Sequence, residues 1–304
     1  MNCIFAYNPN SGKAKSKRVI RVITRRLVAA FDSVRILETD APGDMTRFAR
    51  DACGQCDVFA FLGGDGTFHE VINGLAEQPN RPRLLYIPGG TVNDIARTFR
   101  IPRKPLRAVR ALTRSDKTAK YDIFRVNEGY AAYVICSGLF QSSSYATPQE
   151  RKRVLGRVAY FLDGMKVKFE DESFHVKLTA GDKVFETETP FIALLNSKSV
   201  AGFRINQDAS MTDGKADCVV VRTIRNSQSW IRAIGSIFSV ARLFIVGVRE
   251  IDDVSPNTFI FREGSFRIET SDDVRWGFDG EYGESGNLDI TILQQHIELI
   301  VPSR

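Results

Sequence analysis

Short apolar runs alternate with longer amphipathic stretches over the first 125 residues. The apolar runs have the length of buried strands and lie at 3–7, 33–37, 58–62 and 84–87. The stretches between them carry apolar residues at helical spacing, up to residue 31, over 44–53 and from residue 68 onwards. Strands that alternate with helices in this way are typical of a parallel, doubly wound sheet. The pattern therefore predicts a Rossmann-like α/β domain at residues 1–125.

The pattern changes beyond residue 121, where short β-rich segments predominate. These segments lie at 124–127, 130–136, 174–179, 191–195, 217–222, 257–262, 266–269 and 288–293. Turn residues such as Thr212-Asp213-Gly214 bound them, and strands joined by short turns form antiparallel sheets. We therefore expect a second, mostly antiparallel β domain at residues 126–293, with the boundary near 122–128.

The composition is that of a folded protein with a basic balance of charge. Of the 304 residues, 43% are hydrophobic and 26% are charged, which excludes the disordered and collagen-like classes. The formal net charge of +6 favours anionic partners, among them nucleotides, nucleic acid and a membrane surface. The five cysteines lack the spacing of a disulfide framework and follow no secretory signal, so we expect a cytoplasmic setting. Cys53 and Cys56 form a single CxxC pair, to which we assign no role.

One apolar stretch, at 230–248, approaches the length of a membrane-spanning helix. Arg232 and Arg242 interrupt it, so it lacks the roughly 18 uninterrupted apolar residues that a span needs. It is either a core helix of the second domain or a helix that lies on a membrane surface. The basic run at 151–157 has two similar interpretations, contact with anionic headgroups or a solvated helix face.

Three loops of the first domain share one design, in which an apolar strand ends in a Gly, Asn or Pro turn and a helix follows. They are the loops at 8–13, 63–69 and 88–94. In an open α/β sheet, ligands bind beyond the carboxyl ends of the strands, so the three loops can surround one pocket. Glycines let the backbone approach phosphate oxygens closely, and helix N-termini offer unpaired N–H groups. Together the loops predict a site for nucleotide phosphates.

The spacing within these loops excludes two familiar phosphate-binding signatures. A Walker A motif that ends at Gly12-Lys13 would need Ser or Thr in place of Ala14 and Gly in place of Tyr7. The segment that starts at Gly64 lacks the third glycine of the dinucleotide fingerprint. The chain is therefore neither a standard P-loop protein nor a standard Rossmann dehydrogenase.

Asp65 is unusual because it is an acidic residue between glycines in a loop suited to anions. It would repel phosphate unless a divalent cation lay between them, and Mg²⁺ bridges carboxylates and triphosphates. We therefore expect a magnesium nucleotide at this loop, with Thr67 capping the helix that follows and Glu70 at the third helical position. The alternative is a tight glycine turn in which Asp65 is only a helix cap.

The ordered set of motifs resembles the diacylglycerol kinase catalytic family, which includes bacterial lipid kinases and sphingosine and ceramide kinases. NAD kinases are more distant relatives that share the GGDGT loop. The motifs are Asn8-Pro-Asn-Ser-Gly12, Gly63-Gly-Asp-Gly-Thr67, Glu70-Val-Ile-Asn-Gly74, Pro88-Gly-Gly-Thr-Val-Asn-Asp94, Asp122, Asp208-Ala-Ser-Met-Thr-Asp-Gly-Lys215 and Asp279-Gly-Glu281. The resemblance implies an N-terminal nucleotide domain and a C-terminal antiparallel β-sandwich whose last strand, near 294–304, returns to the first domain. The active site would lie between the two domains.

The resemblance also implies roles for individual residues. Glu281 would be the general base, since a carboxylate within hydrogen-bond reach can take the proton of the attacking hydroxyl, and Asp65 would act beside the metal ion. The residues expected to contact ATP are Asn8, Thr39, Gly63, Gly64, Asp65, Gly66, Thr67, Thr91 and Asn93. From the residues alone, Asp279-Gly280 is equally a hairpin turn.

A second metal site is implied at the turn that contains Asp213. In some bacterial relatives this turn holds a structural Mg²⁺, whose ligands here would be Ser210, Asp213 and Lys215. One carboxylate with backbone carbonyls and water suits Mg²⁺. The same Asp-Gly sequence between apolar strands is also a hairpin signal, so both interpretations stay open.

The sequence departs from the family pattern at three places. His69 stands where asparagine is usual, and we interpret it as a solvated helix residue, not as a catalytic base. The segments at 137–141 and 200–203 carry fewer glycines than the relatives. Both segments belong to the second domain, where the acceptor is expected to bind, so they leave its identity open.

The leading hypothesis is an ATP- and Mg²⁺-dependent lipid kinase. It would transfer the γ-phosphoryl group to the hydroxyl of a diacylglycerol-like lipid, bound peripherally at the inner membrane face. ATP and the lipid are the expected partners, a homodimer is left open, and no nucleic-acid-binding module is recognisable. Two alternatives remain: a kinase of a soluble metabolite such as NAD, and a non-catalytic sensor of nucleotide or lipid.

Overall fold

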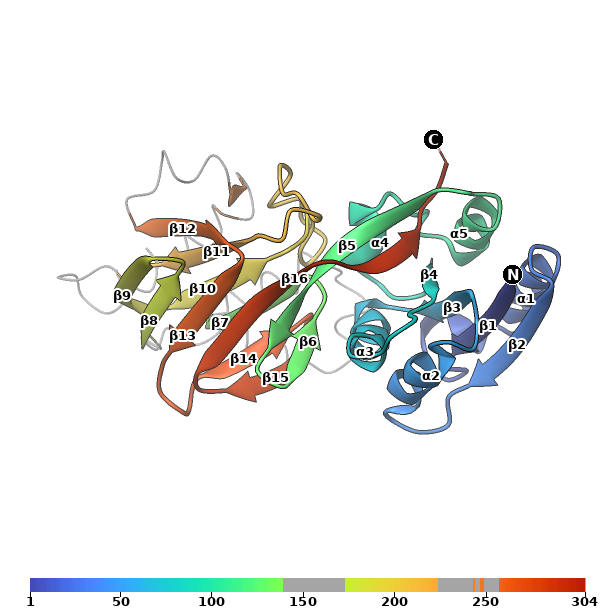
Figure 1. Ribbon diagram of the computed structural model, residues 1–304, viewed down its shortest axis with the longest axis horizontal. Coiled ribbons are helices and arrows are strands. Elements are labelled where there is room, and N and C mark those ends of the chain that lie inside the picture. Colours follow the sequence, from blue (N-terminus) through green and yellow to red (C-terminus); the bar gives the residue numbers. More distant parts are fainter. Residues whose placement is uncertain (139–172, 224–242, 244–246, 249–256, 304) are drawn as a thin grey trace.

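The computed structural model describes residues 1–138, 173–223, 243, 247–248 and 257–303. Helices surround a sheet at one end of the molecule, and strands predominate at the other (Figure 1). We call these parts the α/β region and the β region. The basic run at 151–157 lies outside the described residues, as does most of the stretch at 230–248. No helix in the described part of the chain is long and apolar enough to cross a membrane.

The α/β region contains a parallel sheet, as predicted. Its strands are β1 (Asn2–Tyr7), β2 (Ser33–Glu38), β3 (Val58–Gly63) and β4 (Arg83–Pro88), in the order β2-β1-β3-β4. Its helices are the short 3₁₀ helix η1 (Gly12–Lys15) and the α-helices α1 (Lys17–Val28), α2 (Asp44–Ala52), α3 (Asp65–Leu75), α4 (Asp94–Thr98) and α5 (Pro105–Leu112). Every residue of β3 is buried, as expected of a central strand covered on both faces.

The β region is mostly antiparallel, also as predicted. Its strands are β5 (Thr118–Val126), β6 (Gly129–Ala131), β7 (Val134–Gly138), β8 (Phe174–Ala180), β9 (Lys183–Thr189), β10 (Phe191–Leu195), β11 (Ala216–Val221), β12 (Thr258–Glu263), β13 (Ser265–Glu269), β14 (Arg275–Phe278), β15 (Glu281–Ser285) and β16 (Leu288–Ile300). Six of them form an antiparallel sheet in the order β12-β11-β10-β7-β14-β15.

One hydrophobic cluster of the β region draws side chains from both sheets. Ile192 and Trp276 enter it from the six-stranded sheet, and Val176 and Ile290 enter it from strands of the larger sheet. Along β13, buried and exposed residues alternate, which is the spacing of a strand with one face toward a core. The cluster therefore contains side chains from both sheets.

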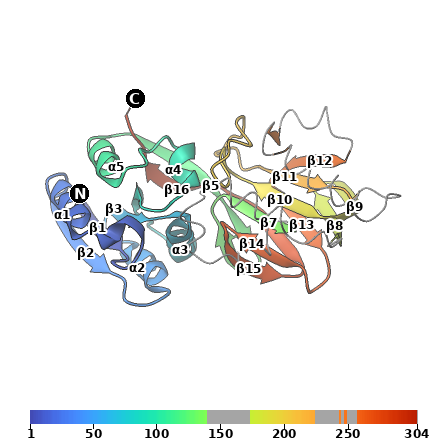
Figure 2. The same ribbon diagram turned by 180° about the vertical axis from the view of Figure 1, so that it is seen from behind.

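Strand β16 continues from the β region into the α/β region, and it runs beside β5 between them (Figures 1 and 2). Near its start it pairs with β13, and along both halves it pairs with β5. Its pairing with β5 is interrupted between Leu293 and Ile297. Close to its end, Leu299 pairs in parallel with Leu84 of β4. The larger sheet is therefore continuous from β2 to β9.

Several elements were not predicted. The sequence pattern missed α4, α5, β9, β14 and β15, and it placed the start of α3 at residue 68 although the helix begins at Asp65. Helix α4 has only five residues, too few for helical periodicity to be recognised. Strands β14 and β15 are short and joined by a two-residue turn, which the sequence analysis considered only as a turn.

Candidate active site

The three glycine-containing loops meet at the carboxyl ends of β1, β3 and β4. A methyl group added to Gly12 would lie 2.7 Å from the carbonyl oxygen of Gly89, and one added to Gly90 would lie 2.7 Å from Cα of Gly64. The N–H of Gly89 donates to the carbonyl of Gly63 at 2.7 Å. The loops therefore pack backbone against backbone and leave no room for side chains between them.

Thr67 does not cap helix α3, contrary to the prediction. The residue at the N-cap is Gly64, which has no side chain to bond with, and Asp65 is the first helical residue. A methyl group on Gly63 would lie 2.3 Å from Cβ of Thr67. A residue with a side chain therefore does not fit at position 63, because Thr67, in the first turn of α3, packs directly against the backbone there.

The other predicted nucleotide contacts border the same edge of the sheet. Asn8 follows β1, and its Oδ1 accepts the N–H of Asn10 at 2.9 Å. Thr39 follows β2, is 7% exposed and donates its N–H to the carbonyl of Tyr7 at 3.0 Å. Thr91 is exposed in the loop after β4. The strand order thus brings residues from all four strand ends to one side of the region.

Asn93, another predicted nucleotide contact, makes hydrogen bonds within its own loop. It is 1% exposed and adopts a left-handed backbone conformation, with φ +55°. Its Oδ1 accepts the N–H of Gly90 at 3.0 Å and the hydroxyl of Tyr86 at 3.2 Å, while Nδ2 donates to the carbonyl of Gly90 at 2.8 Å. Asn93 therefore shapes the loop through its amide oxygen and one N–H of its amide nitrogen.

Asp65 and Asp94 form a pair of buried carboxyl groups behind the loops. Burial raises the pKa of Asp65 to about 7, with a further contribution from Asp94, against backbone N–H groups at the start of α4 that lower it. Burial also raises the pKa of Asp94. Each group has one buried oxygen without a hydrogen-bond partner among the described residues. An uncompensated carboxylate next to a phosphate-binding loop fits a bound cation.

Asp94 also joins the α/β region to the β region. Ser199, in the loop after β10, donates its hydroxyl to Oδ1 of Asp94 at 2.6 Å, and the N–H of Gly202 donates to the same oxygen at 2.9 Å. Sequence reasoning treated Asp94 only as a neighbour of the nucleotide. The contact with Ser199 spans 105 residues, so no local pattern indicates it.

Glu281 lies against the first turn of α3. A methyl group on Gly66 would be 2.7 Å from Oε1 of Glu281, so the GGDGT loop and the Asp-Gly-Glu segment come together. Asp279 and Gly280 both have positive φ and connect the paired residues Phe278 and Glu281, which is the geometry of a tight hairpin turn. The hairpin and the catalytic interpretations are therefore compatible, because the turn presents Glu281 to the helix.

His69 is not the solvated residue that the sequence suggested. Its side chain is 20% exposed, and its Nδ1 lies 2.8 Å from Oδ2 of Asp279. Burial lowers the pKa of His69, but the hydrogen bond with Asp279 and the negative charges of Asp279, Glu281 and Glu70 outweigh it, so that the pKa is raised. Burial and the charge of Glu281 raise the pKa of Glu70. Four ionisable groups thus gather where α3 meets the Asp-Gly-Glu segment.

The predicted structural metal site at Ser210, Asp213 and Lys215 is occupied by protein groups. Arg262 donates to Oδ2 of Asp213 at 2.8 Å, and the N–H of Lys215 donates to Oδ1 at 3.2 Å. A cation bound to Asp213 would therefore have to displace the guanidinium of Arg262.

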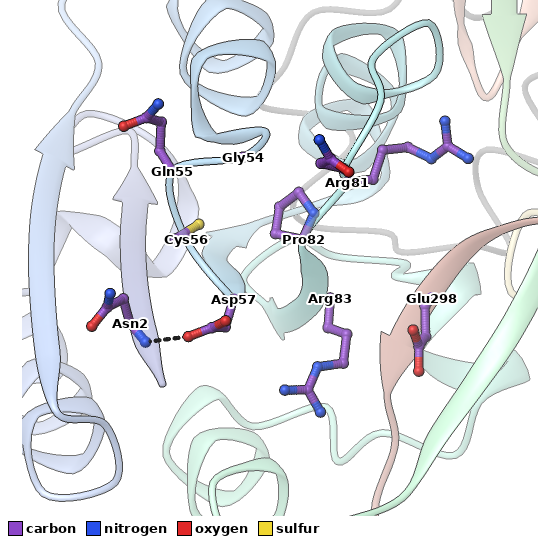
Figure 3. A pocket seen from close by; sticks show the side chains of 10 residues that line it. Asn2, Gly54, Gln55, Cys56, Asp57, Arg81, Pro82, Arg83 and Glu298 are labelled. Atoms are coloured by element: carbon purple, nitrogen blue, oxygen red, sulfur yellow. Dashed lines mark hydrogen bonds between the residues drawn. The ribbon is translucent and has the colours of Figure 1, made fainter.

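A separate hollow of about 490 Å³ lies at the opposite ends of the parallel strands (Figure 3). Its lining residues are Asn2, Gly54, Gln55, Cys56, Asp57, Asn80, Arg81, Pro82, Arg83 and Glu298. Arg81 donates to the carbonyl of Gln78 at 2.8 Å, and Asp57 accepts the N–H of Asn2 at 2.6 Å. The hollow thus has charged groups of both signs, and some of them already form hydrogen bonds with other protein groups. None of the predicted site residues lines it.

Cys53 and Cys56, at the edge of this hollow, are free thiols. Their Sγ atoms donate to the carbonyls of Ala49 and Ala52, each at 3.6 Å. Burial raises the pKa of Cys56 to about 11, so this thiol stays protonated at neutral pH and is a weak nucleophile. The structure gives the CxxC pair no catalytic or metal-binding role.

Comparison with known proteins gives one consistent family. Residues 2–126 match the model of the diacylglycerol kinase catalytic domain. A diacylglycerol kinase of Staphylococcus epidermidis is 32% identical over 298 residues, which cover 97% of this chain and 90% of the relative. A diacylglycerol kinase of Staphylococcus aureus is 30% identical, over 98% of this chain and 91% of the relative.

Solved structures lead to the same family. The crystal structure of a diacylglycerol kinase from Bacillus anthracis superposes with a TM-score of 0.81 at 27% identity and covers 99% of this chain and 96% of its own. An NAD kinase from Archaeoglobus fulgidus, solved with ATP, reaches a TM-score of 0.53 at 10% identity, over 100% of this chain and 94% of its own, which indicates a shared fold only. The chain therefore belongs to the diacylglycerol kinase family, a family of lipid kinases.

Proposed function

We propose that this protein transfers the γ-phosphoryl group of ATP to the hydroxyl of a diacylglycerol-like lipid, with Glu281 as the general base. The hydroxyl oxygen bonds to the γ-phosphorus while the bond from this phosphorus to the β,γ-bridging oxygen breaks, so ADP leaves. The hydroxyl proton passes to the carboxylate of Glu281. Family membership supports the lipid acceptor, and a lipid acceptor implies that the protein meets a membrane surface.

The observation that carries the proposal is the contact between Glu281 and Gly66. Oε1 of Glu281 lies 2.7 Å from the position of a methyl group on Gly66, although 215 residues separate the two in sequence. The carboxylate is exposed, so it is open to a substrate that arrives from solvent. A base next to the phosphate-binding helix is in reach of the oxygen that attacks the γ-phosphorus.

We assign nucleotide binding to the loops that meet at the carboxyl ends of the strands. The backbone of Gly63, Gly64 and Gly66 and the N-terminus of α3 would bind phosphate oxygens, with Asn8, Thr39, Thr67 and Thr91 at the border. Asp65 is the residue that would hold Mg²⁺, and Asp94 lies behind it. When bound, Mg²⁺ supplies neutralisation of phosphate charge.

The domain organisation follows from the same proposal. Residues 1–125 form the nucleotide domain, residues 126–293 form the lipid-substrate domain, and the end of β16, within 294–304, returns to the first domain. The mixed hydrophobic cluster, to which both sheets contribute, supports a β-sandwich in the second domain. The acceptor would then bind between the domains, on the side of Glu281.

The test is a phosphoryl-transfer assay with labelled ATP, Mg²⁺ and phospholipid vesicles that contain diacylglycerol. Wild-type protein should label the lipid, and Glu281→Gln should lower kcat by at least about 100-fold, as expected for loss of a general base. A parallel reaction contains NAD in place of the vesicles. Label in NAD alone would replace the lipid kinase with a metabolite kinase, and binding of ATP without any labelled product would favour a sensor.

A further inference from the structure

His69 and Asp279 form a direct bridge between the two parts of the proposed active site. His69 lies in the second turn of α3, the helix that follows the GGDGT loop, and Asp279 begins the Asp-Gly-Glu segment. Nδ1 of His69 is 2.8 Å from Oδ2 of Asp279, and the carboxylate of Asp279 has no exposed surface. A buried charge-assisted hydrogen bond of this kind is stronger than one between neutral groups.

Asp279 is otherwise held entirely by the β region. Its carboxylate accepts the backbone N–H groups of Ala132 at 2.6 Å, Tyr133 at 2.8 Å and Val134 at 3.2 Å, and its own N–H donates to the carbonyl of Val134 at 2.9 Å. These bonds fix Asp279 relative to the segment that joins β6 to β7. The bond with His69 therefore ties Asp279 itself to α3, beside the two hydrogen bonds that Asn73 of the same helix makes with Tyr130.

Glu281 depends on this tie because it follows Asp279 by two residues, across a turn of two residues with positive φ. Its Oε1 contacts the first turn of α3 at Gly66. The distance between Glu281 and the phosphate-binding loop is thus set by how firmly the Asp279 turn is held against the helix. A displacement of about 1 Å in such a site costs on the order of 100-fold in rate.

One ring nitrogen of His69, Nδ1, is committed to this contact. A carboxylate that already accepts backbone N–H groups only accepts, so Nδ1 carries the hydrogen of the bond to Asp279. On the other side, Nδ2 of Asn73 lies 3.3 Å from Nε2. Asn73 itself exchanges hydrogen bonds with Tyr130, at 3.0 Å to its carbonyl and 3.1 Å from its N–H. The two hydrogens of the Asn73 amide go to the carbonyls of His69, at 2.9 Å, and Tyr130, so His69 holds the interface through Nδ1.

We propose that His69 is a positioning residue: by bonding to Asp279 it holds the Asp-Gly-Glu turn against α3 and so places Glu281 over the GGDGT loop. The inference rests on the proposed function, in which Glu281 is the base. Asparagine is the informative substitution at this position, since its amide can also donate a hydrogen bond to the carboxylate of Asp279.

The test compares His69→Ala and His69→Asn with wild-type protein, and uses His175→Ala as the matched control. His175 is an exposed histidine on β8 that pairs with Glu186 at 3.0 Å, away from the site. We expect His69→Ala to lower kcat by about 10- to 100-fold with a KM for ATP within about twofold of wild type. His69→Asn should recover most of the lost kcat, and His175→Ala should match wild type.

A second measurement, deuterium exchange of backbone amides, needs neither ATP nor lipid. In His69→Ala, exchange should increase over 131–134 and 279–282, while His69→Asn should stay close to wild type. Unchanged exchange and unchanged kcat in His69→Ala would overturn the inference. So would His69→Asn as inactive as His69→Ala with normal exchange, because that result would make the imidazole a proton carrier.

The proposed function is judged separately. If wild-type protein fails to label any lipid but exchange increases in His69→Ala as expected, the bridge stands and the lipid kinase assignment fails. If wild-type protein labels lipid, Glu281→Gln is inactive and His69→Ala behaves as wild type, the assignment stands and the inference fails.

Discussion

Gly66 is the residue of the GGDGT loop that lies against the side chain of Glu281. A methyl group there would lie 2.7 Å from Oε1 of Glu281 and 3.5 Å from its Cδ. The end of a glutamate side chain moves easily, and alanine is a better helix former than glycine, so Gly66→Ala should leave the fold intact. The substitution should instead push the proposed base away from its place and lower kcat.

We therefore expect Gly66→Ala to lose at least about 10-fold in kcat with a melting temperature within a few degrees of wild type. Gly63→Ala is the informative contrast, because its methyl group would lie 2.3 Å from Cβ of Thr67 and should destabilise the protein itself by about 1–3 kcal/mol. Equal kcat in Gly66→Ala and wild type would mean that Glu281 does not act from the observed position.

His69 should also make stability depend on pH. Its pKa in the folded protein is raised above the ordinary value of 6.5 by the bond with Asp279 and by the nearby carboxylates, against burial. The folded state then binds the proton more tightly than the unfolded state, so this stabilisation is fully present below the unfolded pKa and is lost as pH rises through the folded pKa.

The measurement is the free energy of unfolding of wild type and His69→Asn by urea denaturation, from about pH 6 to about pH 9. The difference between the two proteins should be largest at the acidic end and should shrink as pH rises. Both proteins keep His175 and His296, whose contributions cancel in the difference. A difference that grows with pH would show that His69 is held in its neutral form.

Sequence reasoning identified the glycines of the loops, where the backbone is the important feature. It missed the side-chain contacts between residues that are far apart in sequence. Gly63, Gly64 and Gly66 were predicted because glycines after a strand have a local meaning. The role of His69 was misjudged because its partner Asp279 is 210 residues away. Asn93 was predicted as a nucleotide contact, and only the packed loop reveals that its amide also bonds to the backbone of Gly90.

At the scale of elements, the strands of the α/β region were predicted closely because β1, β3 and β4 consist mainly of continuous apolar residues. Strand β3 is buried along its whole length, so its sequence is unambiguous. Strands β14 and β15 are harder to recognise: β15 carries exposed and half-buried residues, and β14 has only four residues. Such strands form because neighbouring strands pair with them, which is information that no short window contains.

The turn between Ala209 and Ala216 is an element whose behaviour toward metal ions can be tested. Its carboxylate, Asp213, is bonded to Arg262, and the two side chains are 33% and 42% exposed. Without nucleotide, the melting temperature should be the same within about 1 °C in EDTA and in Mg²⁺. Because the pair is partly exposed, Arg262→Leu should cost only about 0–1 kcal/mol.

The variant should differ from wild type in a second way. With Arg262 removed, Asp213 is free to bind a cation, so Mg²⁺ should raise the melting temperature of Arg262→Leu but not of wild type. Arg267→Leu is the matched control. Arg267 also forms an exposed ion pair, with Asp289 at 3.4 Å. A wild-type melting temperature that falls in EDTA would restore the metal site at this turn.

At the scale of the whole molecule, β16 makes the α/β region and the β region depend on each other. It pairs with β13 near its start and with β4 close to its end, so the larger sheet is continuous between the two regions through this strand. Leu299 is fully buried at the α/β end, whereas Trp276 is fully buried in the cluster of the β region. If the strand couples the two, damage at Leu299 should be felt at Trp276.

Leu299→Ala should cost about 2–5 kcal/mol, as expected for a leucine truncated in a packed core. In a Trp230→Phe background, Trp276 is the remaining tryptophan of the two, and its fluorescence reports unfolding of the β region alone. Because β16 is shared, the urea midpoint from Trp276 should fall together with the midpoint from circular dichroism, which averages over the whole chain.

Thr291→Ala, at an exposed position of the same strand, should leave both midpoints near wild type. A Trp276 midpoint that stays unchanged while circular dichroism becomes biphasic would mean that the two regions unfold independently, and the shared strand would then be a connection without energetic coupling.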